Sequence, residues 1–331
     1  MRLKNLAAIA LGGTVAFSTA ATFAQEYDTE DMVAATTELF GEHKGYRAVH
    51  AKGFCGEGSF QATAAAADIS KASVFNGEIV PVMFRYSLTP GLPSASDSGE
   101  QIKSLVGRFT PSDGDTFDLL TLSVPMVFMD DPGDFADFFR ALIPDPETGA
   151  PDPDAFEAFV AGHPEVQGFL DYMATHPVHA SYAEAPYFAI HTFYFTNADG
   201  ERRPARWLVE PLAGERALSD DEKAAAGDDF LQAELDERLA DAPVEYDLYL
   251  QFPEEGDPLD NASVAWPADR EKVNVGRLSL ASVDPVGEAG PCDEEMFDPT
   301  GLPDGIEPSD DPVLLIRAEA YAVSFSRRLS D

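Results

Sequence analysis

Residues 187–212 read YFAIHTFYFTNADGERRPARWLVEPL, and this stretch decides the fold class. Aromatic and β-branched residues alternate with others on both sides of NADG, a tetrapeptide typical of tight turns. The pattern predicts two antiparallel strands joined as a hairpin. Further strands are expected within residues 46–128 and at 244–252 and 273–283, where similar runs lie between clusters of glycine, proline and serine.

Helical patterns lie around these strands. Apolar residues recur at helical spacing in residues 27–45, 132–177 and 313–329, and residues 219–243 form a charged helical segment. Strands therefore come in runs and do not alternate with helices one to one. This order indicates an α+β fold with an antiparallel sheet or barrel. With no internal repeat or linker, residues 25–331 are expected to form one domain.

The composition restricts the partners. The chain has 331 residues, 44% of them hydrophobic, which is enough for a sizeable core. It carries 59 Asp and Glu against 22 Lys and Arg, a formal net charge of −37. Such a surface repels nucleic acid and anionic lipid, so neither is an expected partner.

Several site motifs are incomplete or missing. Neither residues 112–118 nor residues 197–203 complete an EF-hand loop, which argues against calcium binding as the reason for the acidity. His176 and His179 lack a carboxylate or cysteine partner at ligand spacing and indicate a metal only weakly. The sequence also contains no P-loop, nucleophile elbow or dinucleotide-binding fingerprint, so it offers no support for nucleotide binding or hydrolysis.

The N-terminus has the pattern of a secretory signal peptide. A positively charged start precedes the apolar run at residues 6–17, and small residues fill 18–24, which predicts cleavage after Ala24. We therefore expect a periplasmic or secreted protein with no membrane insertion after removal of the signal peptide.

The two cysteines, Cys55 and Cys292, are far apart in sequence. In an oxidising compartment an even pair predicts one disulfide, and two buried free thiols are the alternative. A bridge would join the region after His50 to the region near the C-terminus.

Arg317 and Tyr321 are candidate functional residues in the C-terminal helical segment. Their i, i+4 spacing places them on one helix face, where they can touch. A guanidinium beside a phenol favours the phenolate, a hard anionic ligand suited to ferric iron. The alternative is that the arginine faces solvent and the tyrosine packs in the core. Evidence from this helix alone would favour that alternative.

Four motifs together resemble the haem catalases. YRAVHAKG at 46–53 matches the family's R-x-x-H-A-K-G segment, and HTF at 191–193 matches its H-T-F strand. FDPTGLPDGIEPSDDPVLLIRAEAY at 297–321 matches its F-D-P…P-x-G-I-E-P-S loop and its R-x-x-x-Y helix. The resemblance runs in order from about residue 30 to the C-terminus. It implies an antiparallel β-barrel with helices outside, and haem b as the cofactor.

The resemblance also implies roles for individual residues. His50 matches the distal acid–base histidine, and Tyr321 matches the axial ligand of the haem iron, a ligand type known for catalases. Arg317 would hold the tyrosinate. His191 and Asp311 match the residues that orient this arginine.

Further matches concern the haem edge and the distal side. Arg47, Arg108 and Arg328 match arginines that neutralise the haem propionates. Ser123 stands where catalases carry the distal asparagine of N-N-T-P, and the family's long N-terminal arm and C-terminal tail have no match. With these departures the chain is similar to small exported catalase-related peroxidases, which implies weak catalase activity at most.

The implied function is a haem peroxidase that reduces hydrogen peroxide or organic hydroperoxides with an external, unidentified small-molecule electron donor. His50 would take a proton from one peroxide oxygen and return it to the other as the O–O bond breaks. Two alternatives stay open: a haem-binding protein with little turnover, and a haem enzyme that converts fatty-acid hydroperoxides.

Overall fold

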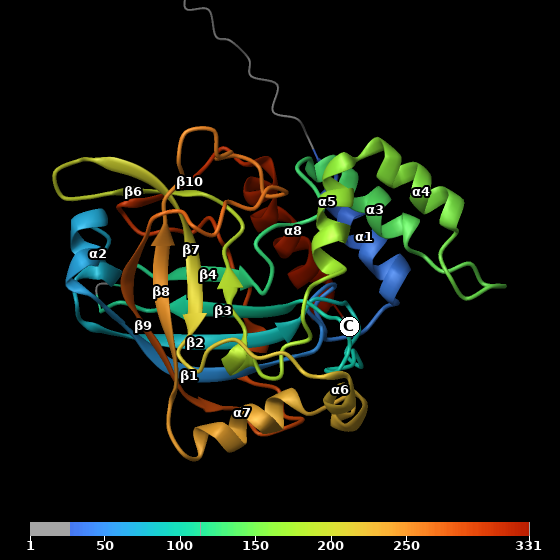
Figure 1. The fold of residues 1–331 in the computed structure, drawn as a ribbon, viewed down its shortest axis with the longest axis horizontal. Coiled ribbons are helices and arrows are strands. Elements are labelled where there is room, and N and C mark those ends of the chain that lie inside the picture. The colour runs from blue at the N-terminus through green and yellow to red at the C-terminus, as the bar shows by residue number, and fades with distance from the viewer. Residues whose placement is uncertain (1–26, 113, 331) are drawn as a thin grey trace, which may run out of the picture.

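An antiparallel barrel of eight strands forms the centre of the molecule (Figure 1). The computed structural model describes residues 27–112 and 114–330, so the predicted signal peptide lies outside the described residues. The barrel strands are β1 (Gly53–Ala62), β2 (Ile79–Leu88), β3 (Lys103–Phe109), β4 (Phe117–Leu122), β5 (Tyr187–Phe188), β7 (Arg202–Pro211), β8 (Val244–Gln251) and β9 (Lys272–Val283). They pair in this order, and β9 closes the barrel on β1. The predicted α+β fold is confirmed.

The hairpin predicted from residues 187–212 is present. β6 (Phe193–Thr196) pairs antiparallel with β7 through a turn that ends at Gly200, whose φ is 83°. Glycine adopts this left-handed conformation without the steric cost of a Cβ. β10 (Ile306–Pro308) adds to the other edge of β6, so the loop that precedes the last helix is fixed to the barrel.

Side chains fill the barrel interior. β2 shows the pattern, since its even-numbered residues Val80, Val82, Phe84, Tyr86 and Leu88 are all buried in the main core. Trp207 and Phe60 are also almost completely buried there. Because strand side chains alternate between faces, the odd-numbered residues of β2 point out of the barrel. A ligand site must therefore lie outside the barrel wall.

The helices surround the barrel. α1 (Thr29–Phe40), α3 (Phe135–Ala141), α4 (Pro153–Gly162) and α5 (Pro164–Met173) form a group beside it. α8 (Pro312–Leu329) runs between this group and the barrel and packs against α1 (Figure 1). None of the described helices is long and apolar enough to cross a membrane.

Two local predictions are wrong. The predicted helix at residues 219–243 is two helices, α6 (Asp220–Ala226) and α7 (Leu231–Leu239), because Gly227 adopts a φ of 78° between them. The short helix α2 (Ala64–Ile69) lies within residues 46–128, which were predicted to be mostly strand. Its four alanines favour helix, and Ile69 is its one β-branched residue.

Cys55 and Cys292 form the predicted disulfide, and both are buried. The bridge joins β1 to the short 3₁₀ helix Pro291–Glu294, 237 positions along the chain. It therefore holds the loop before α8 against the strand that follows His50.

Candidate active site

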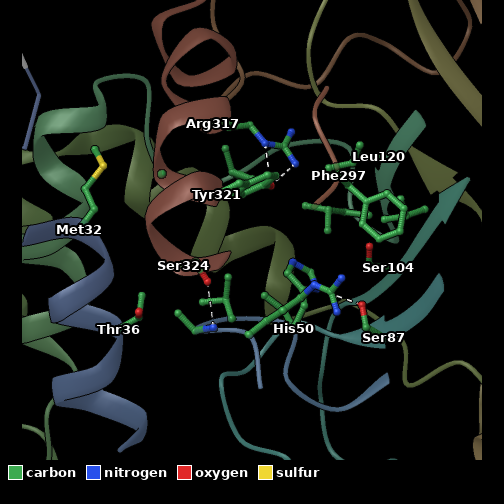
Figure 2. A pocket seen from close by; sticks show the side chains of 18 of the residues that line it. Met32, Thr36, His50, Ser87, Ser104, Leu120, Phe297, Arg317, Tyr321 and Ser324 are labelled. Atoms are coloured by element: carbon green, nitrogen blue, oxygen red, sulfur yellow. Dashed lines mark hydrogen bonds between the residues drawn. The ribbon is translucent and has the colours of Figure 1, made fainter. Parts of the chain in front are cut away.

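A largely apolar cavity lies between the outer face of the barrel and the helices α1, α3 and α8. Val49 and Phe128 are among the apolar residues of its wall, and Ser104 and Leu120 come from the outer faces of β3 and β4. Figure 2 shows side chains from the barrel, the helices and the segment around His50 converging on this space.

One face of α8 forms a wall of the cavity. Arg317, Tyr321, Ser324 and Arg328 recur at helical spacing and all line it. Arg317 donates two hydrogen bonds to the Tyr321 hydroxyl oxygen, from Nε at 2.9 Å and from Nη2 at 2.6 Å. The contact predicted from the i, i+4 spacing is therefore present. An oxygen that accepts two hydrogen bonds from a guanidinium suits an anionic metal ligand.

His191 and Asp311 form a buried pair behind this wall. His191 Nδ1 lies 2.8 Å from Asp311 Oδ2, and the two side chains are 2% and 1% exposed. Burial lowers the pKa of His191 to about 4 despite the carboxylate, so the ring is neutral and donates its Nδ1–H. Its Nε2 is buried without a hydrogen-bond partner within the described structure, and the residue lines the cavity.

His50 has an unusual backbone. Its φ is 59°, and among the described non-glycine residues it alone has a positive φ. A side chain in this left-handed region costs about 1–2 kcal/mol. Its N–H donates to the Thr89 carbonyl at 2.8 Å, and its carbonyl accepts from Arg85 Nη2 at 3.0 Å. Contacts with Arg85 of β2 and with Thr89, just after this strand, therefore hold a strained conformation, which is typical of functional positions.

The imidazole of His50 is prepared to accept a proton. Nδ1 lies 3.2 Å from Ser87 Oγ, which leaves Nε2 for a reactant. Burial, together with the charges of Arg85, Arg317 and Arg47, lowers the pKa of His50 to about 3, so the ring is neutral near pH 7. Figure 2 places His50 and Tyr321 on opposite sides of the cavity.

Arg47, Arg85 and Arg328 gather at one end of the cavity. Asp293 accepts hydrogen bonds from Arg47 and Arg85, at 3.3 Å each. Burial, together with the charges of Arg85 and Arg328, lowers the pKa of Arg47 to about 8 despite Asp293. The Nε of Arg328 is buried with no partner in the described part of the chain. Three cations near one carboxylate suit a ligand with further negative charge.

Arg108 does not line the cavity with this cluster, and its role at a haem propionate stays a prediction. It stands directly opposite Asp118 in the β3–β4 register, and the two side chains form paired hydrogen bonds of 2.8 Å. Glu295 forms a second ion pair with it. Arg108 thus supports the wall from outside, while Arg85 occupies the cavity. The alternation of β2 places Arg85 and Ser87 on its non-core face, a signal from which both could have been predicted.

Ser123 does not lie on the distal side as predicted. Its neighbour Leu122 lines the cavity, whereas the Ser123 hydroxyl accepts from the Lys103 backbone N–H at 3.0 Å and lies 3.4 Å from His176 Nε2. Ser123 faces away from the cavity while Leu122 faces it, because consecutive residues at the end of β4 point to opposite sides. No asparagine-like amide therefore occupies this position of the wall.

Comparisons with known proteins agree with this geometry. The model of the Catalase family matches residues 29–331. A catalase-related peroxidase of Synechococcus elongatus is 38% identical over 324 residues, covering 97% of this chain and 95% of that protein. A catalase-related peroxidase of Mycolicibacterium paratuberculosis is 34% identical, covering 87% and 90%. The crystal structure of a fungal catalase superposes with a TM-score of 0.78 at 22% identity, and the match spans 88% of this chain but 61% of the fungal one.

The fold and the site define a haem-binding oxidoreductase of the catalase type. The features that define it are the antiparallel barrel filled with side chains, the tyrosine bound by an arginine, and the neutral histidine on the opposite side of the cavity. The matches show the family directly: this chain belongs to the catalase family. Membership implies haem binding.

The residues present fit a haem. Three observations support this: the apolar cavity walls, the unpartnered buried Nε of Arg328, and the excess of guanidinium charge. Arg47, Arg85 and Arg328 would hold the two propionates, and Tyr321 would provide the axial oxygen.

Proposed function

We propose that this protein is a haem b peroxidase that reduces hydrogen peroxide or organic hydroperoxides with electrons from an external donor. The observation that carries the proposal is the neutral His50, fixed by Ser87 across the cavity from Tyr321. When bound, the haem iron supplies the site for peroxide and holds the oxidising equivalents.

His50 moves the proton in the first step. Its neutral Nε2 accepts the proton from the nearer peroxide oxygen and returns it to the farther one, so that water leaves. The hydrogen bond between Nδ1 and Ser87 fixes the ring during both transfers. Arg317 stabilises negative charge on Tyr321 throughout, through the two hydrogen bonds to its oxygen.

The distal wall favours the peroxidase reaction over disproportionation. Leu122 and Phe128 line the cavity, and the serine at position 123 points away from it. A second peroxide acting as reductant therefore lacks an amide donor to orient it, and orientation can carry several kcal/mol of a barrier. We expect weak catalase activity at most, and oxidation of an external donor instead.

The test compares wild type, His50→Ala and the control His163→Ala, which removes a histidine outside the cavity wall. Wild type should oxidise a phenolic dye with peroxide and release little oxygen. His50→Ala should retain haem and react with peroxide about 10²–10⁴-fold more slowly, while the control reacts like wild type. Oxygen release at catalase rates, or an unchanged His50→Ala, contradicts the proposal.

We further propose that the protein is exported, on the basis of the pattern in residues 1–24. N-terminal sequencing of the mature protein should then begin at Gln25. A mature chain that keeps Met1 contradicts export by this signal.

A further inference from the structure

A second cavity adjoins the first and shares part of its wall. Its volume is about 400 Å³, and both Arg47 and Arg85 line it as well as the first cavity. The remaining wall comes from residues 45–46 and 51–53, Pro93, Gln232 of α7, residues 287–289 and Asp293. A molecule bound there would be separated from a group in the first cavity by one layer of guanidinium side chains.

Carboxylates and backbone carbonyls already engage the cations of this second cavity. Asp293 accepts from both Arg47 and Arg85, at 3.3 Å each. The Lys52 ammonium lies 2.7 Å from carboxylate oxygens of Asp97 and Asp229. The charge that Arg47 and Arg85 carry in excess of Asp293 would be neutralised by the haem propionates of the first cavity, so an anionic ligand in the second cavity would have to compete with them.

The wall offers uncommitted hydrogen-bond acceptors. The Glu288 carboxylate is exposed and forms no hydrogen bond or ion pair with other described residues. Gln232 donates its amide N–H to the Asp284 carbonyl at 2.9 Å, which leaves its side-chain oxygen as an acceptor. Such a set favours a ligand with O–H donors.

The ligand should also be neutral and partly aromatic. A net charge of −37 repels anions from the whole molecule. The Tyr46 ring, 49% exposed, and Pro93 offer flat apolar surfaces in the wall. Building on the proposed peroxidase function, we propose that the second cavity binds the electron donor, and that this donor is a neutral phenol or hydroquinone.

The reaction balances with this donor. Each phenol molecule loses one electron to the haem and its O–H proton to an acceptor, for which Glu288 is placed in the wall. Two such donors supply the two electrons and two protons that convert one hydrogen peroxide into two waters. The donors leave as phenoxyl radicals, and a hydroquinone that gives both electrons leaves as the quinone.

The test blocks the second cavity with Ala289→Trp. The matched control is Val286→Trp, because Val286 lies in the same loop, is exposed and does not line the cavity. The probe is hydroquinone added to the resting haem-loaded enzyme, and the readout is broadening of its ring-proton NMR signals by the paramagnetic iron. Wild type and the control should broaden these signals, and Ala289→Trp should weaken binding on the order of tenfold because it fills a site of this size.

Rapid-mixing kinetics separate the steps. In Ala289→Trp the reaction with peroxide should match wild type, and reduction by hydroquinone should slow in parallel with the lost binding. Wild-type binding and reduction rates in Ala289→Trp, or faster reduction by anionic ascorbate than by hydroquinone at equal concentration, would overturn the inference. Hydroquinone binding without any peroxide-driven oxidation would refute the proposed function while supporting the cavity as its binding site.

Discussion

Replacing Asp311 tests how the site is anchored to the helix that carries Tyr321. Asp311 Oδ2 accepts from His191 Nδ1 at 2.8 Å, and Oδ1 accepts from the Val313 backbone N–H at 2.9 Å as the N-cap of α8. Asp311→Ala removes both contacts. Asp311→Asn keeps the side-chain size and an oxygen for the cap, but loses the charge.

The expected losses follow from these two contacts. A buried hydrogen bond to a charged group contributes about 1.5–3 kcal/mol, and an N-cap about 1 kcal/mol. We therefore expect Asp311→Asn to lower the free energy of unfolding by about 1.5–3 kcal/mol, and Asp311→Ala to lower it by about 1 kcal/mol more. Asp152→Ala is the control, because Asp152 is an exposed N-cap without a histidine partner, and it should lose only the capping contribution.

The pH dependence gives a second check. Burial raises the pKa of Asp311, but the hydrogen bonds from His191 and from the N–H groups of Val313 and Leu314 outweigh burial, so the net shift is downward. A carboxyl whose folded pKa is depressed stabilises the fold above its unfolded pKa, and this contribution is lost as the pH falls through the folded pKa. The difference between wild type and Asp311→Asn should therefore shrink below about pH 4.

Urea denaturation at pH 7 measures these differences, and the haem absorbance spectrum reports on the surroundings of Tyr321. If the midpoint of the urea transition shifts and the dependence of the unfolding free energy on urea concentration stays the same, only the stability has changed. If Asp311→Asn unfolds within about 0.5 kcal/mol of wild type, the buried charge contributes nothing and the reasoning is refuted.

Three further predictions concern the ligand, the disulfide and acid stability. Tyr321→Phe should lose the wild-type haem spectrum, because it removes the axial oxygen at nearly constant volume; an unchanged spectrum would show that another residue binds the iron. Replacing Cys55 and Cys292 by alanine should cost up to about 5 kcal/mol in urea denaturation, since the bridge spans 237 positions; an unchanged midpoint contradicts this. The pKa of His50 falls to about 3 in the folded protein, so the unfolded chain takes up its proton first and stability falls below about pH 6.5. Between pH 7.5 and 5 the haem-free wild type should lose about 2 kcal/mol more than His50→Ala, and equal losses would show that His50 is not buried as a neutral ring.

Sequence patterns predicted the structure correctly where the local structure depends on a single segment of the chain. The hairpin at residues 187–212 depends on alternation and a turn, both local. The contact between Arg317 and Tyr321 depends on the helical repeat alone. The order of four motifs was sufficient to identify the family, because each motif keeps its own spacing. Gly227 shows the limit, since a single glycine in a helical pattern ended one helix and allowed another to begin.

The sequence by itself determined the α+β class, the family, and the contact of Arg317 with Tyr321 on the last helix. Only the tertiary structure decided which arginine enters the cavity, that Ser123 points away from it, and that a second cavity shares its wall. The reason is physical: a side chain's position depends on the register of its strand and on partners far away in sequence. Asp118 on the neighbouring strand holds Arg108 outside the cavity, and Arg85, on the face of β2 opposite the core, reaches it.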